Sequence, residues 1–285
     1  MQKGERMNDI YLTKGLMAQY AHHLHDEEKS GLTIEKYTRD IRRFARYLDG
    51  NGITKDAVIA YKQQLLNQGY ALRSVNSMLA AVNSFLAFCG LTDCRVRLCR
   101  MQREIYQRSE RELSRAVYLR LLRAAEGNRR LWLLMQTICA TGIRVSELRY
   151  FTVEAVRRGE VSVACKNKNR KILLPDKLQK LLLRYARAAG ITGGIIFRTR
   201  SGKPLDRSNI WAAMKKLCAR AKIDPGKVFP HNLRKLFART FYDLEKDIAK
   251  LADVLGHSSI NTTRIYIMST GQEHRRQLER LRLLA

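Results

Sequence analysis

The sequence predicts a mainly α-helical protein with a small β-sheet, divided into two domains. Three observations support this fold class. A length of 285 residues is typical of two domains of ordinary size. Apolar residues recur at helical spacing through most of the chain, whereas one stretch past its middle has the pattern of two short strands. A hydrophobic content of 45% is enough to form packed cores, so we do not expect a largely disordered chain.

The first domain, residues 1–98, is predicted to contain four short helices that bury a small core together. The first covers Leu12–His25, and Thr33 is the expected N-cap of the second. The run Asp49–Gly52 ends that helix, and Thr54 can cap a third. The fourth helix is expected at Ser74–Phe88, where apolar residues form one stripe. Taken by itself, such a bundle could equally well have no role in binding DNA.

A linker at residues 99–111 and a second domain at residues 112–285 are expected to follow. The linker is rich in Arg and Gln and has little periodicity, and Ser109–Glu112 looks like a helix start. The apolar run Leu131–Cys139 predicts a buried helix. Two strands, Val161–Ala164 and Lys171–Leu174, are predicted on either side of a basic turn, and the remainder is mainly helical.

The charge of the chain points to a polyanionic partner. Lys and Arg number 54 against 26 Asp and Glu, a net charge of +28, and the basic residues are spread through both halves. That distribution is typical of folded surfaces that bind nucleic acid. The sequence has no run of about 18 apolar residues and no signal-like start, so we expect no membrane association and a cytoplasmic location.

Neither the cysteines nor the histidines predict a metal site. The six cysteines lack the Cys-x-x-Cys spacing of zinc sites and are expected to be reduced thiols. The group His22, His23 and His25 has no partner motif and is expected on a solvated helix face. We also find no set of spaced carboxylates such as a two-metal nuclease would need. We therefore expect no cofactor and no metal.

Three short segments together supply two arginines, two histidines and a tyrosine. They are Thr141–Leu148, Pro230–Arg234, and Leu255–His257 followed by Tyr266. Cleavage of a phosphodiester by a tyrosine needs these groups. The phenol is a weak nucleophile with an ordinary pKa of about 10, two guanidiniums can hold the non-bridging oxygens, and histidines donate hydrogen bonds or move protons. Each segment alone is common on solvated faces and in turns, but the ordered set is not.

The local sequence suggests how each group is positioned. Gly142 can end the preceding helix, so that Arg144 lies at the N-terminus of the next one, where Glu147 could orient its guanidinium. Pro230 suits a first helical turn, which places His231 and Arg234 on one face. An amphipathic helix is expected over Lys246–Leu255, closed by Gly256. His257 then follows, and Ser258 or Ser259 can cap the short helix that carries Tyr266.

These residues resemble the tyrosine site-specific recombinases, or phage-type integrases, and in particular the Xer-like members. The resemblance covers the chain from about Leu113 to its end. It implies a helical core-binding, SAM-like domain followed by an α+β integrase-type catalytic domain. It also implies that Arg144, Arg234, His231 and His257 bind the scissile phosphate and that Tyr266 is the nucleophile. Lys235 stands where the family often has a second histidine, at a position that is not a core catalytic one.

The resemblance further implies a lysine on a β-hairpin turn as the general acid for the departing 5′-oxygen. Lys166 aligns best, and Lys168 is the second choice. The implied substrate is double-stranded DNA with specific recombination sites, cleaved through a 3′-phosphotyrosyl ester without ATP by four protomers on two sites. The C-terminal stretch Glu273–Leu284 could dock on a neighbouring protomer or on its own domain. The alternatives are a type IB topoisomerase-like enzyme and a non-catalytic architectural DNA-binding protein.

Overall fold

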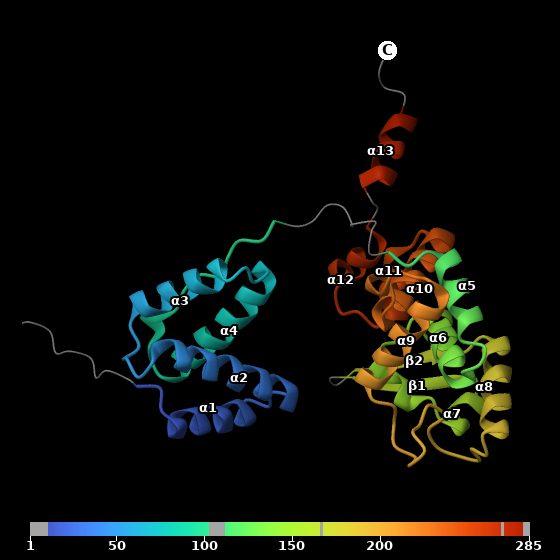
Figure 1. Cartoon of the computed structure of the whole chain (residues 1–285), viewed down its shortest axis with the longest axis horizontal. Coiled ribbons are helices and arrows are strands. Elements are labelled where there is room, and N and C mark those ends of the chain that lie inside the picture. Colours follow the sequence, from blue (N-terminus) through green and yellow to red (C-terminus); the bar gives the residue numbers. More distant parts are fainter. Residues whose placement is uncertain (1–10, 103–111, 166–167, 269–270, 282–285) are drawn as a thin grey trace, which may run out of the picture. The chain divides into compact units, whose positions relative to one another are not determined.

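The chain forms two compact units, each with its own hydrophobic core. The structure, a computed structural model, describes residues 11–102, 112–165, 168–268 and 271–281 (Figure 1). The division between the units falls at Arg103 and Glu104, inside the predicted linker. The predicted domain boundaries themselves stay predictions. The fold class is confirmed, because helices dominate both units and the second unit also carries a small two-stranded sheet.

Four helices form the first unit, as predicted. They are α1 (Lys14–Asp26), α2 (Gly31–Leu48), α3 (Lys55–Asn67) and α4 (Leu72–Phe88), followed by the 3₁₀ turn η1 (Thr92–Cys94). Thr54 caps α3 as expected. The prediction that Thr33 caps α2 was wrong. The hydroxyl of Ser30 accepts the Thr33 N–H at 3.3 Å, so the helix begins three residues earlier.

Beyond η1 the chain runs back along the first unit and is held there by two asparagines of α4. We call residues 95–99 the strap. The Asn83 amide exchanges two hydrogen bonds with the backbone of Val96, at 2.8 and 3.0 Å. The Asn76 amide does the same with Cys99, at 2.9 and 2.7 Å. The strap therefore belongs to the first unit up to Cys99, the first residue of the predicted linker.

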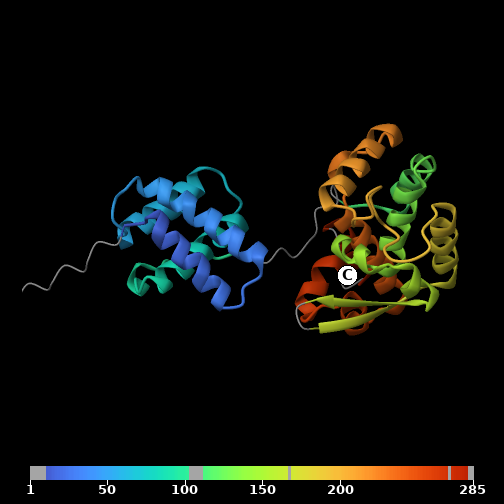
Figure 2. The same cartoon turned by 90° about the horizontal axis from the view of Figure 1, so that it is seen from below.

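In the described part of the second unit, helical segments pack around and beside a β-hairpin. They are α5 (Arg115–Ala124), α6 (Arg129–Thr141), η3 (Val145–Tyr150), α7 (Val153–Arg157), α8 (Asp176–Ala188), α9 (Arg207–Ala221), η4 (Pro225–Lys227), α10 (Pro230–Glu245), α11 (Ile248–Leu255) and α12 (Ile260–Ile267). The helix α13 (Gly271–Arg280) follows them. The hairpin strands, β1 (Glu160–Cys165) and β2 (Lys168–Leu173), are antiparallel, and Val161 lies opposite Ile172. Figure 2 shows the two strands side by side at the edge of this unit.

The strands are longer than predicted, which changes the position of one candidate lysine. We expected residues 165–170 to form a turn, but Cys165 pairs with Lys168 and the ladder continues from there. Lys168 is thus the first residue of β2 rather than a turn residue. The prediction failed because backbone pairing at an exposed hairpin end does not require apolar side chains. The preferred candidate, Lys166, lies outside the described residues.

Of two further predicted helix starts, one lies mostly outside the described residues and the other differs from the structure. The start expected at Ser109–Glu112 falls mostly outside the described residues, and α5 begins at Arg115 with Ser114 as its N-cap. The helix expected from Lys246 begins instead at Ile248. Lys246 has a φ of 54° and ends α10, and the carboxylate of Asp247 caps α11.

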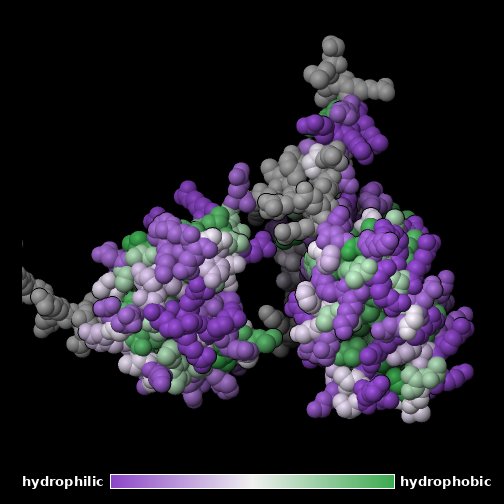
Figure 3. Space-filling model, in the orientation of Figure 1, coloured by the Kyte–Doolittle hydropathy of each residue, from purple (hydrophilic) through white to green (hydrophobic). Residues whose placement is uncertain are grey.

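Apolar packing brings the distant segments of the second unit together. The buried helix predicted at Leu131–Cys139 is confirmed as part of α6, which packs against α8 and α10. A smaller cluster joins α10, α11 and α12 through Ala238, Leu251, Leu255 and Tyr266. Hydrophilic side chains cover much of the visible surface (Figure 3). Among the described residues, no helix has the length and apolar character needed to cross a membrane.

Candidate active site

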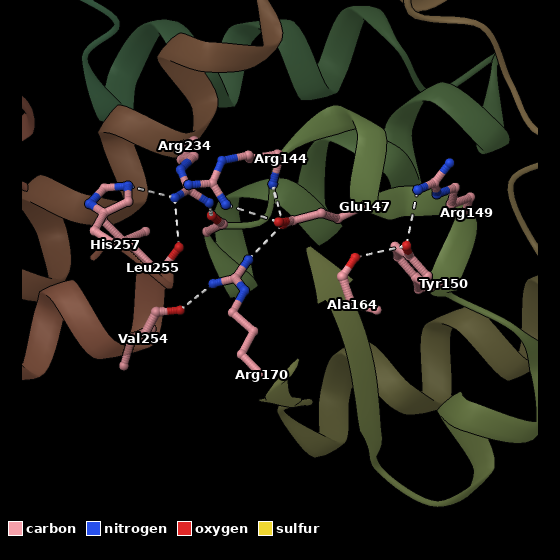
Figure 4. A network of polar contacts seen from close by, with 11 residues as sticks. Arg144, Glu147, Arg149, Tyr150, Ala164, Arg170, Arg234, Val254, Leu255 and His257 are labelled. Atoms are coloured by element: carbon pink, nitrogen blue, oxygen red, sulfur yellow. Dashed lines mark hydrogen bonds and ion pairs between the residues drawn. The ribbon is translucent and has the colours of Figure 1, made fainter. Parts of the chain in front are cut away.

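Arg144 is fixed by the turn that follows α6 and by a buried carboxylate. Gly142 ends α6 with a φ of +62°, and a Cβ there would overlap the Phe237 ring and lie 2.9 Å from Leu255 Cδ2. Arg144 then caps η3. Glu147 Oε2 accepts the Arg144 backbone N–H at 2.7 Å, and Oε1 accepts from its guanidinium at 3.0 Å. The expectation that Glu147 orients Arg144 is confirmed in this geometry (Figure 4).

Arg234 is a buried guanidinium without an anionic partner. It lies one turn after His231 on α10, is 1% exposed, and donates to the carbonyls of Gly142 and, at 2.8 Å, Leu255. Among the described residues it forms no ion pair, and its Nε makes no hydrogen bond. Burial, followed by the nearby charge of Arg144, lowers the pKa of Arg234 to about 10. A buried cation is costly without an anion, so this site favours binding of one.

His257 is held in one tautomer between α10 and α12. Gly256 ends α11 with a φ of +65°, as predicted, and His257 follows. A guanidinium can only donate, so His257 Nε2 accepts from Arg234 at 2.9 Å. The proton must then be on Nδ1, which donates to Thr263 Oγ1 at 2.8 Å. Burial, then the charges of Arg234 and Arg144, lower the pKa of His257 to about 4, so the free site holds a neutral imidazole.

Tyr266 lies among the other candidate residues. It is carried by α12, whose N-cap is Ser259, one of the two predicted caps. Its ring centroid is 5.1 Å from that of His231 and 5.3 Å from that of His257. The guanidinium carbon of Arg234 is 5.8 Å from the same ring. The side chain is 7% exposed, so the tyrosine is packed into the site rather than presented to solvent.

A hollow of about 310 Å³ opens beside these groups, and a phosphodiester group can enter it. Its lining includes the side chains of Arg144, His231 and Arg234, together with Arg207 and Trp211 of α9. His231 as a residue is exposed, but its ring packs against Tyr266. Loss of solvent around the ring lowers the pKa of His231 to about 4. The charges of Lys235 and Arg234 lower it further, so this imidazole is also neutral at pH 7. The hollow therefore combines fixed positive charge with the neutral imidazole of His231.

Comparisons with known proteins agree with this geometry. Residues 111–273 match the Phage integrase family, and residues 17–90 match the phage integrase N-terminal SAM-like domain. The chain belongs to the phage integrase family. Similar proteins include the tyrosine recombinase XerD of Pseudomonas aeruginosa, 31% identical over 82% of this chain and 85% of that protein. The tyrosine recombinase XerA of Pyrococcus furiosus is 27% identical over 98% of both chains.

Solved structures show the same fold. A lambda integrase tetramer bound to a Holliday junction matches with a TM-score of 0.73 at 20% identity, over 91% of this chain and 78% of that one. The XerA recombinase structure matches with a TM-score of 0.53 at 23% identity, over 96% of this chain and 100% of that one. The integrase-type architecture predicted from the motifs is therefore confirmed.

In this integrase-family chain, five of the six candidate residues converge on one site. Arg144, His231, Arg234, His257 and Tyr266 come together, whereas Lys166 lies outside the described residues and the Lys168 side chain is not described. Their roles stay predictions.

Sequence reasoning identified Glu147, which holds Arg144, but missed two other residues that hold the site in place. Thr263, which fixes the His257 tautomer, had no visible signal beyond its place one turn before Tyr266. Arg170 was seen only as part of a basic turn, although strand alternation would have placed it on the face of the buried Val163.

Proposed function

We propose that this chain is a site-specific recombinase that cleaves and rejoins double-stranded DNA through a 3′-phosphotyrosyl intermediate. One observation carries the proposal. Tyr266 packs against two imidazoles and a buried guanidinium that forms no ion pair with any described residue, beside a hollow lined by cations. This arrangement is suited to a bound phosphodiester and a phenol nucleophile. A DNA substrate also supports the expected cytoplasmic location.

In the first step, the phenolic proton of Tyr266 passes to one of the neutral imidazoles beside it, the Tyr266 oxygen attacks the scissile phosphorus, and the bond to the 5′-oxygen breaks. Arg144 and Arg234 hold the non-bridging oxygens, on which negative charge increases. The phosphate displaces no carboxylate from Arg234, because among the described residues none pairs with it. An anion next to His231 and His257 favours their protonated forms, so each can then donate to phosphate oxygens.

The departing 5′-oxygen must receive a proton, because an alkoxide is a poor leaving group at neutral pH. We propose a hairpin lysine for this role, Lys166 by preference and Lys168 as the alternative. The phosphotyrosyl ester retains the energy of the original bond. A 5′-hydroxyl from another strand can therefore attack it, release Tyr266 and join new DNA ends without ATP.

Recombination needs several protomers, and we propose a tetramer on two specific DNA sites. The first turn of α13 contacts its own unit, where Glu273 accepts from Arg239 of α10 at 2.8 Å. Farther along, Leu278 and Leu281 are exposed. Exposed apolar residues are suited to a neighbouring protomer, so we propose that α13 also contacts a second copy of the chain.

Covalent capture on DNA tests the proposal. Nicked duplexes with a randomised site are incubated with the full chain in excess EDTA, and DNA linked to protein is recovered from a denaturing gel. We expect wild type and Tyr242→Phe to form the adduct and Tyr266→Phe to bind the selected duplex without forming it. Adduct of normal yield with Tyr266→Phe would exclude this nucleophile, and absence of any wild-type adduct would exclude the proposed activity.

A further inference from the structure

Arg170 of β2 connects three segments that surround the candidate site. Its Nη2 donates to Glu147 Oε2 at 2.6 Å, and its Nη1 donates to the Val254 carbonyl at 2.6 Å (Figure 4). The residue lies opposite Val163 in the hairpin. One guanidinium thus joins the hairpin to η3 on one side and to the C-terminal turn of α11 on the other.

The Glu147 carboxylate is shared between Arg170 and Arg144. Its Oε2 accepts from the Arg144 backbone and from Arg170, while Oε1 accepts from the Arg144 guanidinium. Glu147 is buried, so without Arg170 it would lose a charged hydrogen bond that water cannot easily replace. The carboxylate could then rotate away from the geometry that orients Arg144.

The contact with α11 is close as well as polar. A Cβ at Gly256 would lie 2.5 Å from Arg170 Cδ, so the arginine stem fills the space beside this turn. Val254 and Gly256 come directly before His257. The turn that presents His257 therefore rests on the stem of Arg170 and is hydrogen-bonded to its guanidinium.

We propose that Arg170 is a positioning residue for DNA cleavage, which acts through Glu147 on Arg144 and through the Val254 carbonyl on His257. The inference rests on the proposed roles of Arg144 and His257. Arginine suits the task because its planar fork donates in two directions at once, whereas a lysine offers a single point charge. Arg170 itself does not need to touch the DNA.

Arg170→Met tests the inference, because it keeps an unbranched stem beside Gly256 and removes the fork. The matched control is Lys171→Met, on the same strand, where the side chain is 69% exposed and pairs with Glu160. Single-turnover cleavage is measured on the duplex captured with wild type. We expect the Arg170→Met rate to fall on the order of 10²-fold, as for a small misplacement of catalytic groups, with DNA affinity and Lys171→Met nearly unchanged.

Arg170→Lys provides a second variant that retains the charge and can reach one acceptor. We expect its rate to lie between those of wild type and Arg170→Met. In a Glu147→Gln background, Arg170→Met should cost less than in wild type, because the route to Arg144 is already broken and only the route through Val254 to His257 is left to lose. A full, independent loss in that background would overturn the inference.

A 5′-bridging phosphorothiolate substrate separates this role from leaving-group protonation. Sulfur leaves without a proton, so a defect in the general acid is rescued and a defect in Arg144 positioning is not. Rescue of Arg170→Met, or cleavage equal to wild type on ordinary DNA, would overturn the inference. Because wild-type and Tyr266→Phe adduct formation is scored on the same duplex, either result leaves the proposed function standing.

Discussion

Arg234 is the residue at which burial and charge conflict most clearly. It is 1% exposed, it is surrounded by carbonyls and an imidazole, and Arg144 is close enough to lower its pKa. A hydrophobic or neutral residue would be more stable there, so the cost is explained only if an anion binds.

The two site histidines predict how stability depends on pH. Both have pKa values lowered to about 4, against an ordinary value of about 6.5. Between these values the unfolded chain binds more protons than the folded one. The contribution of these two histidines to the free energy of unfolding should therefore be complete above pH 6.5 and decrease as the pH drops toward 4. Thermal unfolding of wild type at pH 7.5 and pH 5 measures this loss.

Single substitutions identify the source of that pH dependence. His231→Gln and His257→Gln should each reduce the fall in melting temperature between the two pH values, whereas His25→Gln, exposed on α1, should not. An equal fall in wild type and in both site variants would mean that other groups control the acid sensitivity.

The general acid is the candidate role with least structural support, and substitution can decide it. Lys166→Ala should slow cleavage by about 10²–10⁴-fold, the usual contribution of a placed proton donor. A 5′-bridging phosphorothiolate should restore its rate, but not that of Arg144→Ala. If Lys168→Ala is the rescued variant instead, Lys168 is the acid. If neither is rescued, His231 becomes the next candidate.

At the residue scale, the sequence predicted which side chains meet and that Glu147 supports Arg144, but not the supporting roles of Thr263 and Arg170. Spacing identified His257 and Tyr266, because nine residues separate them along a turn and a helix. Thr263 remained unrecognised although His257 is only six residues away, because a threonine in a short helix has no distinctive pattern. Arg170 remained unrecognised because its partners lie in other segments and are brought near only by packing. Hydrogen bonds between distant segments leave little trace in local patterns.

At the element scale, helix ends were predicted well where glycine must take a left-handed conformation. Gly142 and Gly256 both end helices with positive φ, and each directly precedes a site segment. The start of α11 was misplaced because Lys246 takes the same conformation without being glycine. The strand lengths were underestimated because polar residues complete the hairpin.

The strap offers a prediction for the first unit. Each α4 asparagine makes two hydrogen bonds to the strap backbone, and a net value of about 0.5–1.5 kcal/mol each suggests a local loss of about 1–3 kcal/mol per asparagine. Asn76→Ala and Asn83→Ala should therefore open the strap more often. Trypsin cleavage after Arg97 and Arg100, followed by mass spectrometry, should become on the order of tenfold faster.

The control for the strap is Asn67→Ala, at the end of α3, where the amide bonds only to the Gln63 side chain. Its cleavage after Arg97 should match that of wild type. Unchanged cleavage in Asn76→Ala and Asn83→Ala would show that the lysine contacts to the strap, such as Lys62 to the Arg97 carbonyl at 2.8 Å, are sufficient.

At the scale of the whole molecule, net charge affects DNA affinity, whereas the arrangement of protomers affects which tyrosine reaches which phosphate. A net charge of +28 favours DNA binding of any sequence and makes it sensitive to salt. It does not define which protomer supplies the nucleophile to a given phosphate. The choice of phosphate depends on the position of α12, because Tyr266 on this helix could attack the phosphate bound by its own chain or one bound by a neighbour.

The structure favours cleavage within one protomer. Tyr266 lies within 5.8 Å of the Arg234 guanidinium of its own chain, and Thr263 on the same helix bonds to His257. A mixture of Tyr266→Phe and Arg144→Ala should therefore form no adduct, because neither chain holds both the nucleophile and the intact phosphate site. In a second mixture, of size-tagged wild type and Tyr266→Phe, adduct should form on the wild-type chain alone. Adduct on the Arg144→Ala chain in the first mixture would show that the tyrosine attacks the phosphate held by a neighbour.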